Sequence, residues 1–464
     1  ILRATGGVHP LDVTFIDDED LATPWKREIT ASKKLKGPMP QSLTVTLANL
    51  IYFEKAQLPQ ALANRLIRLA AFQNPEFYKA QAMRMSVWDK PRIIGCAENF
   101  PQHIALPRGC FDAARELLAE NGIRLDLRDE RHAGTPVAVG FSGTLRPDQE
   151  AAVAAMLRHD EGVLCAPTAF GKTVTAAAII ARRGVNTLVL VHRTELLKQW
   201  QVRLAAFLDA GKEVIGIIGG GKNKPTGQID IAVMQSLSRQ GEVDPMVESY
   251  GQVIVDECHH VGAASFDAIL RRAKAKHVVG LTATPIRRDG QQPIIFMQCG
   301  PIRHKAVQPL DAPRDLAVTP QFIESPIALL PEAGIQDVFR HLAQYAARTA
   351  AIASAITEAF QQGRKVLALT ERTEHIDAIR AALADQVPEP FVLHGRMSKK
   401  QRAVLIAALD GLSPDAPRLL LATGKLVGEG FYEPVDDMGP DRECSAPKTL
   451  DYLATTFTSS GYDV

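Results

Sequence analysis

Continuous apolar runs alternate with helical patterns through the middle of the chain. The runs are apolar at successive positions, which is typical of strands that are buried on both faces of a parallel sheet. Residues 173–183 and 194–208, which lie between such runs, show the apolar spacing of helices. The order predicts an α/β lobe over residues 140–304. The predicted strands are 162–166, 187–191, 214–218, 229–234, 253–256 and 277–281.

A second block with the same rhythm covers residues 344–431. It follows a proline-rich, irregular segment, 305–343, that we interpret as a hinge. The second block is shorter than the first and predicts an incomplete lobe of the same type. Its predicted helices and strands are a helix ending near 362, strands 365–369, 391–393 and 418–422, and helices 373–384 and 398–409.

The two ends of the chain differ from these lobes. Residues 1–42 carry an acidic cluster and then a basic stretch with prolines, which is typical of a linker or of the tail of an upstream domain. Residues 43–139 predict a small α/β domain with helices at 59–72 and 112–121, the second ended by Gly122. Residues 432–464 show little periodicity and predict an irregular tail.

Composition narrows the protein class. The 464 residues are 46% hydrophobic and 23% charged, with a formal net charge of +1, so any nucleic-acid binding must come from local patches. No apolar run is long enough to cross a membrane. The six cysteines form no C-x-x-C pair, which argues against a zinc ribbon and favours a reducing cytoplasm. The chain begins at Ile1, which suggests a fragment.

Residues 163–175 read VLCAPTAFGKTVT and predict a phosphate-binding loop between a strand and a helix. Lys172 would reach the β- and γ-phosphates of ATP, and the Thr173 hydroxyl would bind Mg²⁺. Ala166 stands where the motif usually has its first glycine. The alternative is a helix start with a chance lysine. The predicted cradle is Pro167, Thr168, Ala169, Phe170, Gly171, Lys172 and Thr173.

Residues 253–259, VIVDECH, form an apolar run that ends in two adjacent carboxylates. An Asp at the carboxyl end of a parallel strand lies beside the phosphate loop, so Asp256 would hold Mg²⁺. Glu257 would orient or deprotonate the attacking water. The alternative is a solvated strand end. Together with the loop, the pair predicts ATP hydrolysis by Lys172, Asp256 and Glu257.

These motifs resemble a known family. D-E-C-H resembles the D-E-x-H box of superfamily-2 helicases, and residues 281–289, LTATPIRRD, resemble an element of the XPB, UvsW and restriction-subunit-R branch. Residues 145–149, LRPDQ, look like the adenine-side element of that branch. The chain looks closest to helicases of TOTE conflict systems, which implies a partner or fused primase or nuclease. The resemblance implies two RecA-like lobes, the second truncated, with ATP between them.

The resemblance also assigns roles to individual residues. Arg146 and Gln149 would bind the adenine side, although Gln149 could instead be a surface residue at a helix start. Gln235 and Ser236 could likewise be a polar loop rather than a strand contact. Residues implied in coupling hydrolysis to movement are His259, Thr282, Ala283, Thr284, Gly428 and Gly430. Residues implied in nucleic-acid contact are Arg193, Thr194, Gln235, Ser236, Arg372, His394, Gly395, Arg396 and Thr423.

One family element has no counterpart. The family carries a Q-x-x-G-R-x-x-R segment after the position of Phe431, whose arginines stabilise transition-state charge, but here only Arg442 follows. The first hypothesis is an ATP-dependent helicase or translocase, acting on DNA rather than RNA. The second is a nucleotide-gated DNA-binding module with weak turnover, because the arginine finger is missing. The tail could also be a frame-shifted or truncated end.

Two further segments leave alternatives open. Residues 61–92 interleave basic residues with Phe72, Phe77, Tyr78 and Trp88, which could bind a phosphate backbone and stack bases. The aromatic residues could equally form a core beneath a solvated basic face. Residues 219–224, GGGKNK, predict a flexible loop with solvated lysines. On helix 194–208, Trp200 is expected in the core.

Overall fold

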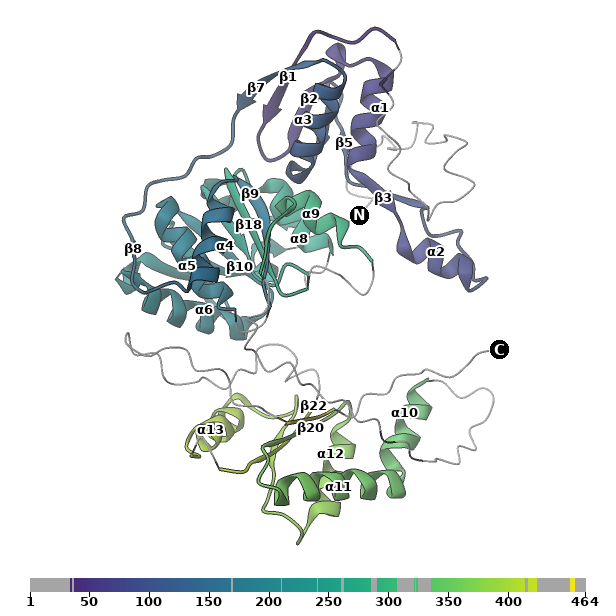
Figure 1. Ribbon diagram of the computed structural model, residues 1–464, viewed down its shortest axis with the longest axis vertical. Helices are drawn as coiled ribbons and strands as arrows, with labels where there is room; N and C mark the ends of the chain where they lie inside the picture. Colours follow the sequence, from purple (N-terminus) through teal and green to yellow (C-terminus); the bar gives the residue numbers. More distant parts are fainter. Residues whose placement is uncertain are drawn as a thin grey trace. The chain divides into compact units, whose positions relative to one another are not determined.

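The computed structural model divides the chain into two compact units, Ile1–Gln308 and Pro309–Val464 (Figure 1). The first unit holds an N-terminal domain and a large α/β lobe, and the second holds a smaller α/β lobe. The prediction of an α/β protein with two parallel-sheet lobes behind a small α/β domain is confirmed. The structure describes residues 34–35, 37–167, 170–209, 211–239, 241–259, 263–284, 290–306, 321, 323, 335–413, 416–423 and 451–454.

The N-terminal domain is a five-stranded sheet in the order β5-β6-β2-β1-β7. Its strands are β1 (Ser42–Leu47), β2 (Ile51–Glu54), β5 (Glu98–Asn99), β6 (His103–Leu106) and β7 (Arg124–Asp129). Helices α1 (Gln60–Leu69) and α3 (Phe111–Glu120) bury their apolar faces against the sheet. Gly122, with a φ of +71°, follows the end of α3 as the sequence predicts. A smaller hairpin, β3 (Ala71–Gln73) with β4 (Ile93–Gly95), carries α2 (Pro75–Ala82) between its strands.

The lobe of the first unit is built on an eight-stranded sheet in the order β13-β12-β14-β10-β17-β18-β9-β19. The ladders between neighbouring strands are parallel except for the one between β12 and β13. The strands are β9 (Glu161–Cys165), β10 (Thr187–Val191), β12 (Ile215–Gly219), β13 (Lys222–Lys224), β14 (Ile229–Val233), β17 (Gln252–Val255), β18 (His277–Thr282) and β19 (Ile302–Lys305).

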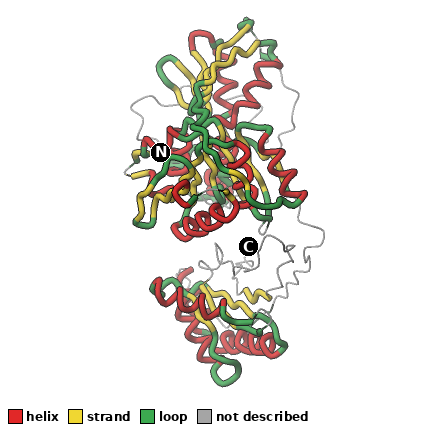
Figure 2. The backbone as a smooth tube through the Cα atoms, turned by 90° about the vertical axis from the view of Figure 1, so that its left-hand side faces the viewer, coloured by secondary structure: helices red, strands yellow, loops and turns green. Residues whose placement is uncertain are grey.

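Helices cover both faces of this sheet, as Figure 2 shows. On one face, α4 (Pro147–Leu157), α5 (Lys172–Arg183) and α6 (Thr194–Phe207) pack on side chains such as Leu164 and Val189. On the other face, α7 (Met234–Leu237), α8 (Ala263–Arg272) and α9 (Pro293–Cys299) pack on side chains such as Leu188 and Leu190. Successive strand residues therefore enter opposite cores, which explains why the strands read as continuous apolar runs.

The glycine-rich segment at 219–224 is not a flexible loop. It is a hairpin in which β12 and β13 pair antiparallel, with Gly219 opposite Lys222. Gly220 and Gly221 form the turn with φ values of +59° and +82°. Two-residue hairpins require positive φ at both central positions, which glycine adopts without steric cost. The side chains of Lys222 and Lys224 are exposed along this sheet edge, as the sequence predicts.

The second unit contains a four-stranded parallel sheet in the order β21-β22-β20-β23. Its strands are β20 (Val366–Thr370), β21 (Phe391–Leu393), β22 (Leu419–Thr423) and β23 (Asp451–Ala454), and its helices are α10 (Ile335–Gln344), α11 (Ala346–Gln361), α12 (Thr373–Leu383) and α13 (Lys399–Asp410).

Two elements of this unit differ from the sequence prediction. Helix α10 begins inside the segment predicted as a hinge, and β23 lies inside the segment predicted as an irregular tail. Residues 451–454 are too few to show a period, and they form a strand only because β20 offers an edge with which Asp451 pairs opposite Val366. Pairing to a preformed edge is a long-range property that local periodicity cannot reveal.

The N-terminal domain is attached to the first lobe through buried polar contacts. The Arg108 side chain is buried, and its guanidinium donates to the carbonyl oxygens of Ala273 at 2.6 Å and Ala275 at 2.7 Å. The Asn49 amide donates to the carbonyl oxygen of Arg271 at 2.6 Å. Burial of a guanidinium is costly unless its donors are paired, and both terminal nitrogens of Arg108 are paired here, whereas its Nε has no partner among the described residues.

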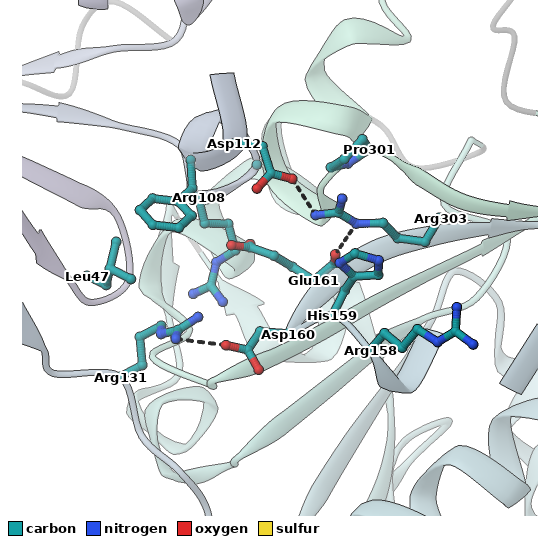
Figure 3. A pocket seen from close by; sticks show the side chains of 12 residues that line it. Leu47, Arg108, Asp112, Arg131, Arg158, His159, Asp160, Glu161, Pro301 and Arg303 are labelled. Carbon is teal, nitrogen blue, oxygen red and sulfur yellow. Dashed lines mark hydrogen bonds and ion pairs between the residues drawn. The ribbon is translucent and has the colours of Figure 1, made fainter. Parts of the chain in front are cut away.

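A polar pocket of about 210 Å³ lies at the same interface (Figure 3). Arg131 of the N-terminal domain pairs with Asp160 at 2.9 Å, and Arg303 of the lobe pairs with Asp112 at 2.6 Å. Burial raises the pKa of Glu161, whereas the guanidinium of Arg108 acts in the opposite direction. Ion pairs thus cross the interface in both directions and hold the domain and the lobe as one unit.

The five cysteines in the described part of the chain are buried and form no disulfide. No helix among the described residues is both long enough and apolar enough to cross a membrane.

Candidate nucleotide-binding site

The phosphate loop has the strand–loop–helix order that the sequence predicts, running from β9 to α5. Gly171 lies just before α5 with φ +88° and ψ +41°, a left-handed conformation. A Cβ atom at this position would lie 2.6 Å from the Gln149 amide nitrogen, so both the backbone and the space require glycine. Thr173 lies half-buried in the first turn of the helix. Thr168 and Ala169 fall outside the described residues.

Ala166 fits the place of the usual first glycine. Its backbone is not left-handed, and its side chain is fully buried. Its N–H donates to the carbonyl oxygen of Thr282 at 2.8 Å, which ties the start of the loop to the end of β18. A glycine is needed where φ is positive or where space is lacking, and neither condition holds here.

Asp256 lies directly after β17 and is 7% exposed. Its carboxylate accepts a hydrogen bond of 2.6 Å from the Trp200 indole nitrogen and one of 3.0 Å from the Glu257 backbone N–H. Burial raises the pKa of Asp256 to about 6, and the hydrogen bond from Trp200 opposes that rise. A bound cation would favour the ionised form, so this carboxylate suits a divalent metal ion.

Glu257 has a backbone φ of +43°, which is strained for a residue with a side chain. Its Oε1 atom lies 3.2 Å from Lys172 Nζ, and that ammonium also donates to the carbonyl oxygen of Ala166 at 3.4 Å. Its Oε2 atom is buried and accepts no hydrogen bond from the described residues. The loop lysine and the second carboxylate of D-E-C-H therefore meet directly.

His259 links this carboxylate pair to the end of β18. Its Nδ1 atom lies 2.7 Å from Thr282 Oγ1 and 3.4 Å from Glu257 Oε2. The Thr282 hydroxyl donates its proton to the carbonyl oxygen of Thr284 at 2.9 Å, so Nδ1 of His259 must be the protonated nitrogen in their contact. Nearby, the Cys165 thiol contacts the carbonyl oxygen of Ala283 at 3.6 Å.

Gln149 and Arg146 both contact the phosphate loop. The Gln149 amide donates to the carbonyl oxygen of Phe170 at 2.8 Å and accepts from the Arg146 backbone N–H at 3.0 Å. The Arg146 guanidinium donates to the same Phe170 oxygen at 2.9 Å and lies 5.8 Å from the centroid of its ring. Gln149 is 4% exposed, so it is not a surface residue at a helix start.

The predicted strand contacts of the first unit follow the carboxyl ends of β10 and β14. Arg193 precedes α6, and Thr194 is its exposed first residue. Gln235 is exposed and Ser236 half-buried on α7. A Cβ atom at Gly220 would lie 2.6 Å from Thr194 Cγ2, and one at Gly219 would lie 3.1 Å from Ser236 Oγ, so both residues border the glycine-rich hairpin. The parallel ladders place them on the same sheet edge as Asp256.

The predicted contacts of the second unit also share one sheet edge. Arg372 follows β20 and precedes α12, and Thr423 is the last residue of β22. His394, Gly395 and Arg396 follow β21, and the Arg396 backbone N–H donates to His394 Nδ1 at 3.3 Å. Gly428 and Gly430 lie outside the described residues, as do residues 285–289.

Trp200 belongs to the site, although sequence reasoning placed it only in the core. It is 2% exposed, as expected for a core residue, but its indole N–H holds Asp256 across 56 positions of sequence. No motif in the chain marks this pair. The signal that could have found it is chemical, because a buried tryptophan needs an acceptor for its N–H and a buried carboxylate needs a donor.

Replacing Trp200 by phenylalanine is expected to lower the free energy of unfolding by about 1–3 kcal/mol, because the buried carboxylate of Asp256 loses a donor. Loss of the same hydrogen bond should raise the pKa of Asp256 further, since that bond lowers it. Urea unfolding measures the first effect. The matched control is Trp88→Phe, at a side chain that is 89% exposed, which should change stability by less than about 0.5 kcal/mol. Equal losses in both variants would contradict the assignment.

Comparison with known proteins agrees with this geometry. Residues 142–287 match the family model of the type III restriction enzyme res subunit. The chain is 33% identical over 161 residues to the DNA 3'-5' translocase XPB2 of Sulfurisphaera tokodaii, covering 35% of each chain. It is 30% identical over 189 residues to the putative ATP-dependent RNA helicase L396 of Acanthamoeba polyphaga mimivirus, covering 40% of this chain and 36% of that protein.

The crystal structure of T4 UvsW matches with a TM-score of 0.43 and 15% identity, over 82% of this chain and 80% of that one. The chain spans about a third of the length of the two curated relatives, at 35% and 36%. The family model covers the phosphate loop, D-E-C-H and L-T-A-T-P segments together. Over these segments the chain is therefore similar to superfamily-2 helicases of the XPB and restriction-subunit-R branch.

Proposed function

We propose that this protein is an ATP-dependent motor that moves along nucleic acid, acting as a helicase or translocase on DNA rather than on RNA. The observation that carries the proposal is the continuous contact from Lys172 through Glu257 and His259 to Thr282. This series of contacts connects the place where a phosphate would bind to the end of strand β18. A simple nucleotide-binding protein has no need of it.

The residues present fit a nucleoside triphosphate. Backbone N–H groups at the start of α5 favour an anion, and the ammonium of Lys172 supplies a neighbouring positive charge. When a nucleotide binds, Lys172 would exchange its ion pair with Glu257, at 3.2 Å, for contacts with the phosphates. The buried carboxylate of Asp256 and the hydroxyl of Thr173 are oxygen ligands of the kind that Mg²⁺ prefers. Bound Mg²⁺ would neutralise charge that develops on the phosphates.

Glu257 is the residue that would take a proton from the attacking water. Its Oε2 atom is buried and accepts no hydrogen bond within the described residues, so it has acceptor capacity to spare. Its strained backbone aims the side chain at Lys172 rather than into solvent. Asp256, held by Trp200, cannot turn to replace it.

His259 would couple the state of the phosphate site to the carboxyl end of β18. A change in the position of Glu257 alters the contact of 3.4 Å with His259, and the imidazole is bonded to Thr282. Arg193, Thr194, Gln235 and Ser236 lie on the same sheet edge and would contact the phosphate backbone of a bound strand. The name of the Sulfurisphaera relative, a DNA translocase, supports DNA as the substrate.

The test is phosphate release from ATP by the purified chain, measured alone and with single-stranded DNA, duplex DNA or RNA of equal length. The expected result is turnover that DNA stimulates more than RNA does. Nucleotide-dependent DNA binding without stimulated turnover would instead support the rival hypothesis of a nucleotide-gated binding module. Stronger stimulation by RNA would overturn the choice of DNA and leave the motor assignment standing.

A further inference from the structure

We propose that the loop formed by residues 83–90 of the N-terminal domain binds unpaired nucleotides, with a base stacked on the Trp88 ring. This inference rests on the proposed function, because it assigns a strand contact to a nucleic-acid motor. The loop connects α2 with β4. Figure 1 labels α2 and the neighbouring strand β3 of the small hairpin. Nucleotides would be recognised here by their aromatic faces and their phosphates, without reading of base edges.

The loop exposes large apolar side chains that a folded protein normally covers. Trp88 is 89% exposed, Met85 62% and Met83 59%. These three side chains fall within a few positions of each other, whereas single exposed apolar residues elsewhere need no explanation. The cluster therefore marks a candidate binding surface.

The other aromatic residues of this region behave differently. Phe72 packs against the core of the N-terminal domain. Phe77 and Tyr78 contact each other edge to face, with ring centroids 5.3 Å apart, and the Tyr78 hydroxyl accepts from Arg92 at 3.2 Å. The sequence left open whether these aromatic residues form a core or stack bases, and the two alternatives apply to different residues. Phe72 is structural, and Trp88 presents a free ring face.

Residues 79–92, which include Trp88, carry more cations than anions, which favours a polyanion as the partner. Asp89 is neutralised by Lys90 at 3.1 Å. Lys79 and Arg84 are exposed and form no ion pair with any described residue. Aromatic rings that stack bases, flanked by cations that meet phosphates, form the usual arrangement for binding single strands. An apolar protein partner would leave these cations uncompensated.

The loop is held in a defined shape at its base. The buried Asn74 donates from its backbone N–H to Arg92 O at 3.0 Å and from its side chain to Pro91 O at 2.8 Å. At the end of α2, Met85 donates to the carbonyl oxygen of Ala80 at 2.8 Å, and Arg84 takes a φ of +54°. Glycine usually occupies such a position after a helix, so arginine here carries a conformational cost. A preorganised loop loses less entropy on binding.

The loop is also connected to the lobe that carries the nucleotide site. A Cβ atom at Gly290 would lie 2.6 Å from the Pro75 ring, so the first residue of α2 rests on the backbone that leads into α9. The helix that precedes the loop therefore contacts the first lobe.

The test uses tryptophan fluorescence of the full chain titrated with a twenty-nucleotide oligo(dT) strand, without nucleotide. Of the two tryptophans that the structure describes, Trp88 is exposed and Trp200 is buried, so stacking should quench emission in the wild type and not in Trp88→Ala. Trp88→Ala should weaken binding of the single strand about 5- to 150-fold, as expected for one lost stacking contact. Trp88→Phe should retain most of the affinity, because phenylalanine preserves a stacking face.

Several controls make the result specific. Val404→Ala, at a side chain that is 65% exposed on α13, should change nothing. Trp88→Ala should leave unchanged the slope of the logarithm of the binding constant against the logarithm of salt concentration. Lys79→Ala should reduce the magnitude of that slope by about one, because one fewer counterion is released. Unchanged affinity of Trp88→Ala for oligo(dT), with the fold intact by circular dichroism, would overturn the proposal. Equal losses for single-stranded and fully paired DNA would also overturn it.

The failure of this inference and the failure of the proposed function are distinguishable. Binding is measured without ATP, so a chain that binds through Trp88 but shows no DNA-stimulated turnover would overturn only the motor assignment. If single-stranded DNA stimulates ATP turnover of Trp88→Ala as it does for the wild type, only the role of the loop would be overturned.

Discussion

Lys172→Ala is expected to lower the rate of DNA-stimulated ATP hydrolysis by about 10²- to 10³-fold, the usual loss when one charge-stabilising donor is removed from an active site. The lysine is paired with Glu257 at 3.2 Å, and it is the first residue of α5. Phosphate release under saturating DNA measures the effect. The affinity for ATP should fall as well, because the Lys172 ammonium would contact the phosphates both in the ATP-bound state and during hydrolysis.

A matched control for this lysine lies on the neighbouring helix. Lys198 on α6 is exposed and outside the site, so Lys198→Ala should retain wild-type turnover. Lys172→Ala also leaves Glu257 without its cationic partner, so its melting temperature should be compared with that of the wild type. A folded Lys172→Ala protein that hydrolyses ATP at the normal DNA-stimulated rate would remove the phosphate-loop assignment.

Glu257→Gln is expected to reduce hydrolysis by about 10²- to 10⁴-fold while leaving ATP binding nearly unchanged. Glutamine preserves the shape of the side chain and can still accept from Lys172, but its amide cannot take a proton from water. Single-turnover hydrolysis measures the chemical step, and titration with a fluorescent ATP analogue measures binding. The two variants therefore separate loss of binding from loss of chemistry.

The control for the second variant is Glu116→Gln on α3, where the carboxylate is exposed and far along the chain from the motifs. It should have no effect on either measurement. If Glu257→Gln weakened ATP binding as strongly as Lys172→Ala, the carboxylate would serve to hold the loop rather than to activate water. The strained φ of +43° would then be a structural feature without a part in proton transfer.

The parallel sheet could be predicted because its physical cause is local in sequence. Strand β10 is buried at each position and apolar at every position after Thr187, so it appears as a continuous apolar run. The phosphate loop and the carboxylate pair directly follow such runs, and carboxyl ends of parallel strands meet at one sheet edge. Their proximity therefore follows from the order of elements, and the structure places Lys172 against Glu257.

Contacts between distant segments could not be predicted in this way. Trp200 and Asp256 meet through a hydrogen bond that no spacing encodes. Arg108 reads as one basic residue among many until its guanidinium is found buried against Ala273 and Ala275. Strand β23 depends on the free edge of β20.

The sequence by itself determined the fold class, the order of the lobes and the positions of the phosphate loop and the D-E-C-H box, because periodicity and strand-end motifs are properties of neighbouring residues. Only the tertiary structure decided which aromatic residue is exposed and which supports the site. Trp88 is 89% exposed and Trp200 is 2% exposed, yet in the sequence both tryptophans are surrounded by a mixture of polar and apolar residues. Burial depends on what packs against a residue from elsewhere in the chain, and that is settled only when the chain has folded.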